Sequence, residues 1–326
     1  MKKILVTGAA GFIGMHLALS LLGDGYEVTG YDNLNEYYDI SLKLARLEKL
    51  RTLPLFEFVK GDLADGAAVR QLLSKGDFDC VVNLAAQAGV RYSLTHPETY
   101  ISSNLTGFFN IIDAVKEFAV PHFVYASSSS VYGANTKLPF SEEDKTESPV
   151  SLYAATKKAN ELLAHSYSSM FGTATTGFRF FTVYGPYGRP DMALFIFVKN
   201  ILDGVPLQVF NHGDMQRDFT YIDDIVAGIR ALMERSASLT DEKLPYRVYN
   251  IGNSSPVQLM DFIGAIEDEL GKKAVIEFMP LQPGDVKSTY ADVCRLEKDT
   301  GFAPRTPLAQ GVRQFVQWYR DYYNLR

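Results

Sequence analysis

The sequence predicts an α/β protein built on a doubly wound parallel sheet, with a smaller α/β lobe after it. Short β-branched runs alternate with helical patterns through the first half of the chain, which is the order of βαβ units. A glycine-rich turn joins the first run to the first helix. Beyond about residue 183 the pattern becomes irregular, with four Gly and Pro residues within 185–190. We therefore expect a first domain over 1–183, with a returning segment at about 218–255, and a second lobe mainly over 184–326.

The composition is that of a globular protein. The 326 residues are 47% hydrophobic, enough for a large core, and the net charge of -6 argues against general nucleic-acid binding, which needs clustered Lys and Arg. Cys80 and Cys294 support neither a disulfide framework nor a zinc site, and we expect no metal. Because the N-terminus lacks a signal-peptide pattern and no apolar run has membrane-spanning length, we expect a cytoplasmic protein without a membrane partner.

The first strand is expected at Ile4–Thr7, and a helix through about Leu22 follows the turn that holds Gly8, Gly11 and Gly14. Such a turn lets backbone N–H groups approach the phosphates of a dinucleotide at the positive end of a helix. Its spacing is GxxGxxG rather than GxGxxG, so the motif alone is also compatible with a purely structural turn.

The second strand, Tyr26–Tyr31, ends at Asp32, eighteen positions after Gly14. A carboxylate there would bind the ribose hydroxyls of the cofactor's adenosine and repel a 2′-phosphate, which favours NAD over NADP. Asp62 follows the third strand, where it could reach the adenine amino group or could cap a helix.

The remaining elements are expected from the same alternation. A charged pattern at Tyr38–Arg51 indicates a solvated surface helix. Small residues from Leu84 to Ala88 would let a flat cofactor lie against the backbone. The other expected strands are Leu55–Lys60, Cys80–Leu84, His122–Ala126 and Tyr246–Ile251, and two later helices are expected at Val257–Leu270 and Leu308–Tyr322.

A serine cluster and a Tyr/Lys pair carry the chemistry. Ser127–Ser130 follow the fifth strand, at the sheet edge where doubly wound folds bind ligands. Tyr153 and Lys157 are four positions apart, so they share one helix face. A free Tyr has a pKa near 10, and a neighbouring ammonium favours its phenolate. This pattern predicts that Tyr153 acts as an acid or base, and it argues against the alternative that Tyr153 is only a half-buried aromatic side chain.

These motifs, together with Val131-Tyr132-Gly133 after the serines, resemble those of the extended short-chain dehydrogenase/reductase superfamily, nearly from end to end. Within it, Ala88–Ser93 and Phe180–Ala193 resemble the UDP-glucuronic acid 4-epimerases. The resemblance implies a Rossmann domain that binds NAD, a lobe that binds a UDP-sugar, and a homodimer formed through helices around 98–118 and 151–171. It implies interconversion of UDP-glucuronate and UDP-galacturonate at C4, through a transient 4-keto sugar.

The resemblance also assigns roles to residues. Tyr153 would be the base, Lys157 its tuner, and Ser128 the hydroxyl that binds O4. Ser129 and Ser130 stand where related dehydratases carry Asp-Glu, and decarboxylases carry Glu at the second place, which favours chemistry confined to C4. The implied cofactor contacts are Gly8, Gly11, Phe12, Ile13, Gly14, Asp32, Asn33, Asn35, Asp62, Leu63, Leu84, Ala85, Ala86, Tyr153, Lys157 and Phe180.

Thr182 and Arg189 favour an acidic sugar. Thr182 replaces the Asn of the UDP-galactose 4-epimerases, and a guanidinium such as that of Arg189 can bind a carboxylate bidentately. Arg217 is expected on the diphosphate and Asp285 on the uridine ribose. The implied substrate contacts are Gln87, Arg91, Ser128, Ser129, Thr182, Arg189, Phe210, Arg217 and Asp285.

Three alternatives stay open from the sequence. A UDP-glucose/UDP-galactose 4-epimerase shares the core motifs, and only Thr182 and Arg189 argue against it. A UDP-glucuronate decarboxylase would be expected to carry Glu at position 130. A non-catalytic NAD-sensing protein of the same fold would be expected to lack the Tyr153/Lys157 pair.

Overall fold

The structure is a computed structural model that describes residues 2–235, 243–281 and 287–325. These residues form two compact units. The first comprises the described parts of 1–136, 142–180 and 226–250, and the second those of 137–141, 181–225 and 251–326.

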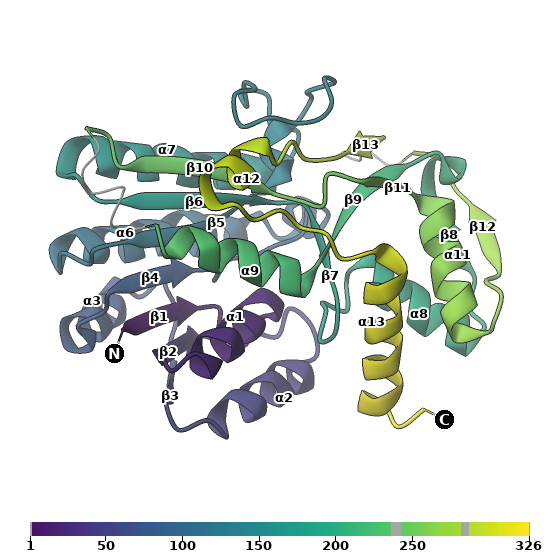
Figure 1. The fold of residues 1–326 in the computed structure, drawn as a ribbon, viewed down its shortest axis with the longest axis horizontal. Helices are drawn as coiled ribbons and strands as arrows, with labels where there is room; N and C mark the ends of the chain where they lie inside the picture. Colours follow the sequence, from purple (N-terminus) through teal and green to yellow (C-terminus); the bar gives the residue numbers. More distant parts are fainter. Residues whose placement is uncertain (1, 236–242, 282–286, 326) are drawn as a thin grey trace. The chain divides into compact units, whose positions relative to one another are not determined.

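The first unit is built around a seven-stranded sheet with the order β3-β2-β1-β4-β5-β6-β10 (Figure 1). From β3 to β6 every neighbouring pair runs parallel. The doubly wound sheet predicted from the alternation is confirmed. Its strands are β1 (Lys3–Thr7), β2 (Glu27–Asp32), β3 (Phe56–Lys60), β4 (Cys80–Asn83), β5 (Phe123–Ser128), β6 (Thr175–Phe180) and β10 (Tyr246–Ile251).

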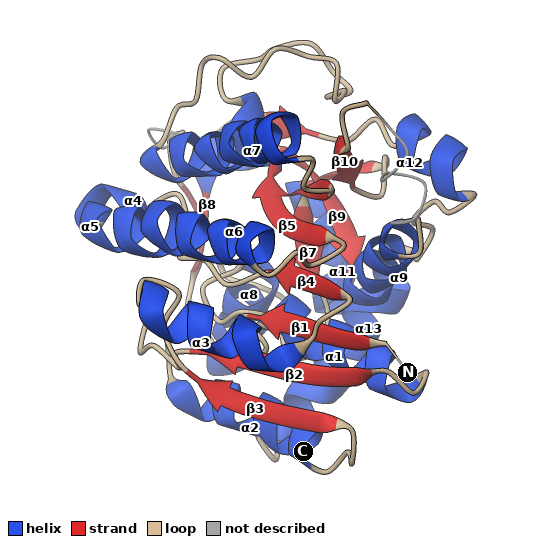
Figure 2. Cartoon of the chain, turned by 90° about the vertical axis from the view of Figure 1, so that its left-hand side faces the viewer, coloured by secondary structure: helices blue, strands red, loops and turns tan. Residues whose placement is uncertain are grey.

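Helices cover both faces of this sheet, with α3, α6 and α7 on one face and α1, α2 and α9 on the other (Figure 2). The helices and helical turns of this part of the chain are α1 (Phe12–Gly23), α2 (Ile40–Arg51), α3 (Gly66–Gly76), α4 (Tyr92–Thr95), α5 (Pro97–Tyr100), η1 (Ile101–Thr106), α6 (Gly107–Glu117), η2 (Ser129–Tyr132), α7 (Leu152–Phe171) and α9 (Ile222–Met233), the last of which begins in the second unit.

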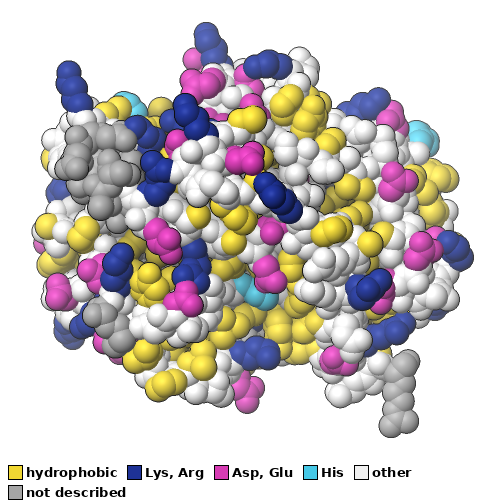
Figure 3. Space-filling model, in the orientation of Figure 1, with side chains coloured by type: hydrophobic (Ala, Val, Ile, Leu, Met, Phe, Trp, Pro, Cys, Tyr) yellow, Lys and Arg dark blue, Asp and Glu magenta, His cyan; other side chains and the backbone are white. Residues whose placement is uncertain are grey.

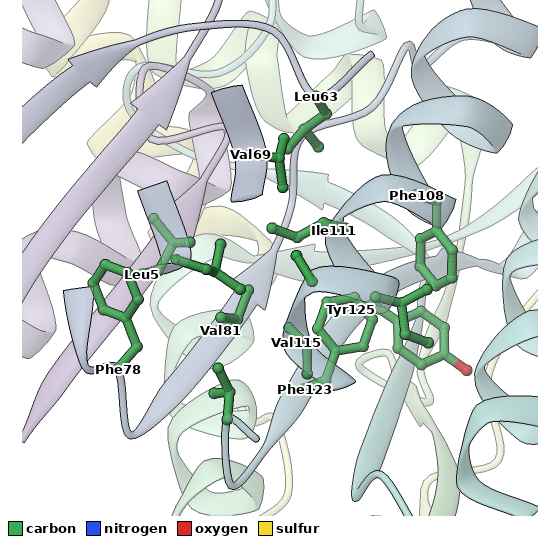
Figure 4. Packing of buried hydrophobic residues seen from close by; sticks show 14 of the residues in the cluster. Leu5, Leu63, Val69, Phe78, Val81, Phe108, Ile111, Val115, Phe123 and Tyr125 are labelled. Atoms are coloured by element: carbon green, nitrogen blue, oxygen red, sulfur yellow. The ribbon is translucent and has the colours of Figure 1, made fainter. Parts of the chain in front are cut away.

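The main core lies between the sheet and α3, α6 and α7 (Figure 4). Leu5, Val81 and Phe123 project from the strands and meet Val69 of α3 and Ile111 of α6. Each such side chain contributes roughly 1.5–3 kcal/mol when fully buried. This packing holds β1, β4 and β5 in place, and the predicted catalytic and cofactor residues follow the ends of those strands.

The described part of the second unit contains short strands and four helices. β9 pairs with β11, β13 and β7, and β8 pairs with β12. Its elements are β7 (Thr182–Tyr184), α8 (Ala193–Asp203), β8 (Leu207–Val209), η3 (Phe210–Gly213), β9 (Gln216–Tyr221), β11 (Pro256–Gln258), α11 (Leu259–Leu270), β12 (Ile276–Phe278), β13 (Ser288–Thr289), α12 (Cys294–Thr300) and α13 (Leu308–Tyr322).

The interpretation of 38–51 as a solvated surface helix is right for one face of the helix, which exposes Ser41, Leu44, Glu48, Lys49 and Arg51, and wrong for two of its cations. α2 forms there, but Lys43 and Arg46 are buried with Leu42, Leu47 and Leu50. The two cations lie inside with the leucines because each finds hydrogen-bond acceptors within the unit.

The surface carries both signs of charge. On the face drawn in Figure 3, Lys and Arg side chains are interspersed with Asp and Glu. Each helix in the described part of the chain is too short or too polar to cross a lipid bilayer.

Candidate active site

Ser128 stands at the end of β5, where the strand turns into η2. Its hydroxyl accepts a hydrogen bond from the Ser130 amide at 3.2 Å and donates one to the Ser130 hydroxyl at 3.1 Å. Across the β5–β6 pair, the register places Phe180 opposite Ser128. Ser128 is therefore the N-cap of η2, and its backbone is extended at the carboxyl edge of the sheet.

Tyr153 and Lys157 lie in the first turns of α7. The helix begins after Ser151, whose hydroxyl accepts a hydrogen bond from the Ala154 amide at 3.1 Å. Lys157 is buried, and its ammonium donates to the Ala126 carbonyl of β5 at 2.9 Å. This bond joins the helix of Tyr153 to the strand of Ser128.

Burial lowers the pKa of Lys157 to about 8. A lysine in water titrates near 10.4, so this ammonium is held at a cost in solvation free energy. A buried cation on the face of α7 that also carries Tyr153 is the arrangement that stabilises a phenolate. The Tyr153 ring also packs edge-on against Tyr100, with ring centroids 6.1 Å apart.

A buried ion pair supports this corner, and sequence analysis missed it. Arg179 of β6 donates to both carboxylate oxygens of Glu161 on α7, at 2.8 and 2.9 Å. Glu161 also accepts from the Ser127 hydroxyl at 2.7 Å, and Arg179 donates to the Tyr132 hydroxyl at 3.1 Å. Burial alone would raise the pKa of Glu161, but the bonds and charge of Arg179 hold it below its ordinary value. Glu161 lies one helical turn after Lys157, so its position on the same helix face could have indicated that it is buried near the site.

The glycine turn lies at the carboxyl end of β1. Gly8 has a φ of +71°, and its amide donates to the Tyr31 carbonyl of β2 at 2.7 Å. A side chain on Gly14 would come within 2.1 Å of the Gly8 carbonyl, so the turn closes only with glycine there. Phe12 and Ile13 open α1 directly after Gly11.

Asp32 ends β2 beside this turn. Its carboxylate accepts from the amides of Leu34 at 2.8 Å and Ala10 at 3.1 Å. Burial raises the pKa of Asp32, and these two bonds with the charges of Lys43 and Arg46 act in the opposite direction.

Asn33 donates to the Asp62 carboxylate at 2.9 Å, which brings the ends of β2 and β3 together. Leu63, the next residue, is buried, and Asn35 accepts from Lys43 at 2.6 Å. The alternative that Asp62 caps α3 was wrong, because the carboxylate of Asp65 accepts from the first amides of that helix.

The segment after β4 runs against the glycine turn. A side chain on Gly8 would come within 2.8 Å of the Ala85 amide nitrogen, which in turn donates to the Thr7 hydroxyl at 3.2 Å. Leu84 and Ala86 flank it, half-buried. Gln87 is buried, and its backbone N–H donates to the Asn104 side-chain oxygen at 2.8 Å. Arg91 is exposed at the start of α4.

The remaining predicted residues belong to the second unit. Thr182 begins β7, Phe210 begins η3, and the Arg217 guanidinium donates to the carbonyls of Gln216 and Lys287. Arg189 donates to both oxygens of Asp191, at 3.0 and 2.5 Å. Asp285 lies outside the described residues.

The first unit therefore brings the ends of β1, β2, β4, β5 and β6 to one edge, where open α/β sheets bind ligands. α1 starts there without a side-chain cap and without an acidic residue in its first turn. Amides at an uncapped helix start bind anions, and Asp32 supplies an acceptor for hydroxyls. These donors and acceptors fit a dinucleotide such as NAD, with its diphosphate on the turn. The contacts assigned to single residues stay predictions.

Comparison with known proteins places the chain among nucleotide-sugar enzymes. The model of the NAD dependent epimerase/dehydratase family matches residues 4–252. The chain is 48% identical to UDP-glucuronate 4-epimerase 6 of Arabidopsis thaliana, over 99% of this chain and 73% of that protein. It is 44% identical to the probable UDP-glucuronate 4-epimerase of Rhizobium meliloti, over 98% of both. The crystal structure of UDP-glucuronic acid 4-epimerase from Bacillus cereus with UDP-glucuronic acid and NAD superposes with a TM-score of 0.91, at 35% identity, over 98% of this chain and 100% of that one.

Proposed function

Because the chain belongs to the NAD dependent epimerase/dehydratase family, we propose that it interconverts UDP-glucuronate and UDP-galacturonate by epimerisation at C4. The observation that supports this function is that Ser128, Tyr153 and Lys157 lie at the same sheet edge as the glycine turn before α1. Bound NAD would supply the acceptor, and then the donor, of the C4 hydride.

The residues of the chain handle the proton. Tyr153 takes the proton of the O4 hydroxyl and later returns it, while Ser128 donates a hydrogen bond to O4. The Lys157 ammonium stabilises the phenolate form of Tyr153. Glu161 is not available as a further acid or base, because Arg179 and Ser127 already bind both of its oxygens. Because Ser129 and Ser130 also stand where related dehydratases carry Asp-Glu, chemistry confined to C4 is favoured over proton removal at C5.

The acidic group of the sugar is assigned to Thr182 and Arg189 of the second unit. Arg189 binds both oxygens of Asp191 through its Nε and Nη2 atoms, which shows that its guanidinium can bind a carboxylate bidentately. The carboxylate of the sugar would have to displace Asp191 from this edge or bind another edge of the guanidinium. A 4-keto uronate is a β-keto acid, and it loses CO₂ when the bond to its carboxylate aligns with the ketone. The enzyme must hold that carboxylate out of alignment, and we assign this task to the same two residues.

Replacement of Arg189 with Ala tests this assignment. We expect kcat/KM for UDP-glucuronate to fall roughly 10- to 100-fold. This fall corresponds to the loss of about 1.4–2.8 kcal/mol from a charge-assisted bidentate contact. The fall of kcat/KM for UDP-glucose should be smaller, because that sugar has no carboxylate. The fraction of UDP-4-ketopentose among the products should rise. Chromatography of the nucleotide sugars measures both effects.

A matched control removes an exposed, paired cation elsewhere in the same unit, Lys199→Ala on α8, and should leave the product ratio unchanged. If Arg189→Ala also keeps the ratio of the unmodified enzyme, the assignment of the carboxylate fails.

We also propose that the protein is a cytoplasmic homodimer. Helices α6 and α7 lie side by side (Figure 2). They expose large apolar side chains, among them Phe109, Leu162, Met170 and Phe171, at 44–64% of their full exposure. Large apolar side chains exposed on neighbouring helices are candidates for an interface between subunits. Light scattering of the purified protein measures its mass, and a single-chain mass of about 36.3 kDa would contradict the dimer.

A further inference from the structure

Two buried cations on α2 lie beside the glycine turn. Lys43 is 5% exposed and Arg46 is fully buried, and the charge of both acts on the Asp32 carboxylate. A buried cation is costly unless hydrogen bonds and opposite charge compensate it. Here two positive charges act on one carboxylate. Both side chains also donate to backbone carbonyl oxygens, Lys43 to that of Asn35 and Arg46 to that of Ala10.

Arg46 contacts the turn itself. Its Nη1 donates to the Ala10 carbonyl at 3.0 Å and to the Tyr38 hydroxyl at 2.6 Å. The amide of Ala10 donates to Asp32 at 3.1 Å. Both backbone groups of Ala10 are therefore hydrogen-bonded to charged side chains. The Asp32 carboxylate accepts from its N–H, and the Arg46 guanidinium donates to its carbonyl.

This clamp fixes the backbone that starts α1. The Ala10 carbonyl belongs to the peptide whose nitrogen is that of Gly11, and the Gly11 amide donates to the Gly8 carbonyl at 2.9 Å. Phe12 then begins the helix. The orientation of the peptide that Arg46 holds therefore sets the direction of the first helical amides, which are the groups that bind phosphate at a helix start.

We propose that Arg46 is a positioning residue for NAD: it clamps the turn and supplies buried positive charge behind the uncapped start of α1, so that the turn is preorganised for the cofactor's diphosphate. Its guanidinium donates to the Ala10 carbonyl, so Arg46 would act on NAD through the backbone of the turn. Lys43 contributes charge and holds the neighbouring segment by donating to the Asn35 carbonyl at 2.6 Å.

Arg46→Met tests the proposal by cofactor binding, without a sugar substrate. We expect the dissociation constant for NAD, from calorimetric titration, to rise at least 10-fold, and NAD retained per chain after gel filtration to fall. The matched control is Arg51→Met, which removes the same charge from an exposed position of the same helix and should change the constant less than 2-fold.

Arg46→Lys provides a second variant that keeps the charge but not the guanidinium fork. Its dissociation constant should lie between those of the unmodified protein and Arg46→Met. A purely structural role would instead lower the melting temperature of the NAD-free variants and leave NAD affinity of the folded fraction unchanged, which overturns the proposal. The inference rests on the NAD dependence of the proposed function. If the unmodified protein fails to bind NAD, that function fails, whereas equal binding by all variants removes only the role of Arg46.

Discussion

Tyr153→Phe should lower kcat for UDP-glucuronate roughly 10³-fold while NAD content and UDP binding stay within about 3-fold of the unmodified enzyme. The change removes only the hydroxyl, and general acid–base catalysis by one positioned side chain contributes about 10²–10⁴-fold. The phenyl ring of the variant would keep the edge contact with Tyr100, because that contact involves no hydroxyl. Initial rates of product formation, with NAD content from chromatography of the denatured protein, measure the two quantities.

The matched control is Tyr167→Phe, which removes a hydroxyl from the same helix, more than three turns further along. That hydroxyl donates to Asp113 at 3.1 Å, so its loss should lower stability by about 1 kcal/mol and change kcat little. A Tyr153→Phe enzyme that retained more than a tenth of the unmodified kcat would rule out Tyr153 as the base.

Lys157→Met should lower kcat roughly 10²-fold and should also change how stability depends on pH. The loss of the ammonium leaves the Tyr153 phenolate without its buried positive neighbour. Met has a similar length and carries no charge, so the packing of α7 against β5 is largely kept. We expect NAD-free Lys157→Met to fold.

The sign of the pH effect follows from proton binding. Burial lowers the pKa of Lys157 to about 8 in the folded state, while the unfolded state titrates near 10.4. Between these values the unfolded chain binds the extra proton, so a rising pH favours the folded state. The free energy of unfolding of the unmodified protein should therefore increase relative to Lys157→Met by roughly 1.5 kcal/mol from about pH 8 to about pH 9.5, and the difference should be flat well below pH 8.

Denaturant titrations of both NAD-free proteins at several pH values give this difference, in which titrations common to both proteins cancel. The same difference at every pH from about 7 to about 9.5 would contradict the lowered pKa of Lys157.

The sequence was most informative where the chain meets the edge of the sheet. Gly8 follows a strand, and Asp32 and Ser128 each end one. Because parallel strands end at the same edge, the proximity of these residues could be predicted from order alone. β6 was not expected as a strand, because Gly177 and Arg179 interrupt its apolar pattern. Both are buried, and a side chain on Gly177 would meet the Tyr125 ring at 2.6 Å.

Buried charge could not be predicted in the same way. Arg46 and Glu161 belong to helices whose pattern places charged residues in solvent, and only the structure reveals their acceptors and partners. The bidentate contact of Arg189 with Asp191 could not be predicted either. The two residues are two positions apart, and the contact depends on how the turn between them orients their side chains.

The most direct test of the function uses purified, NAD-loaded protein incubated with UDP-glucuronate and no added reductant, followed by separation of the nucleotide sugars and measurement of absorbance at the NADH wavelength. Epimerisation at C4 returns the hydride to the sugar that gave it, so UDP-galacturonate should form without net NADH. Formation of UDP-xylose as the main product, or no turnover of the acidic sugar, would contradict the assigned activity.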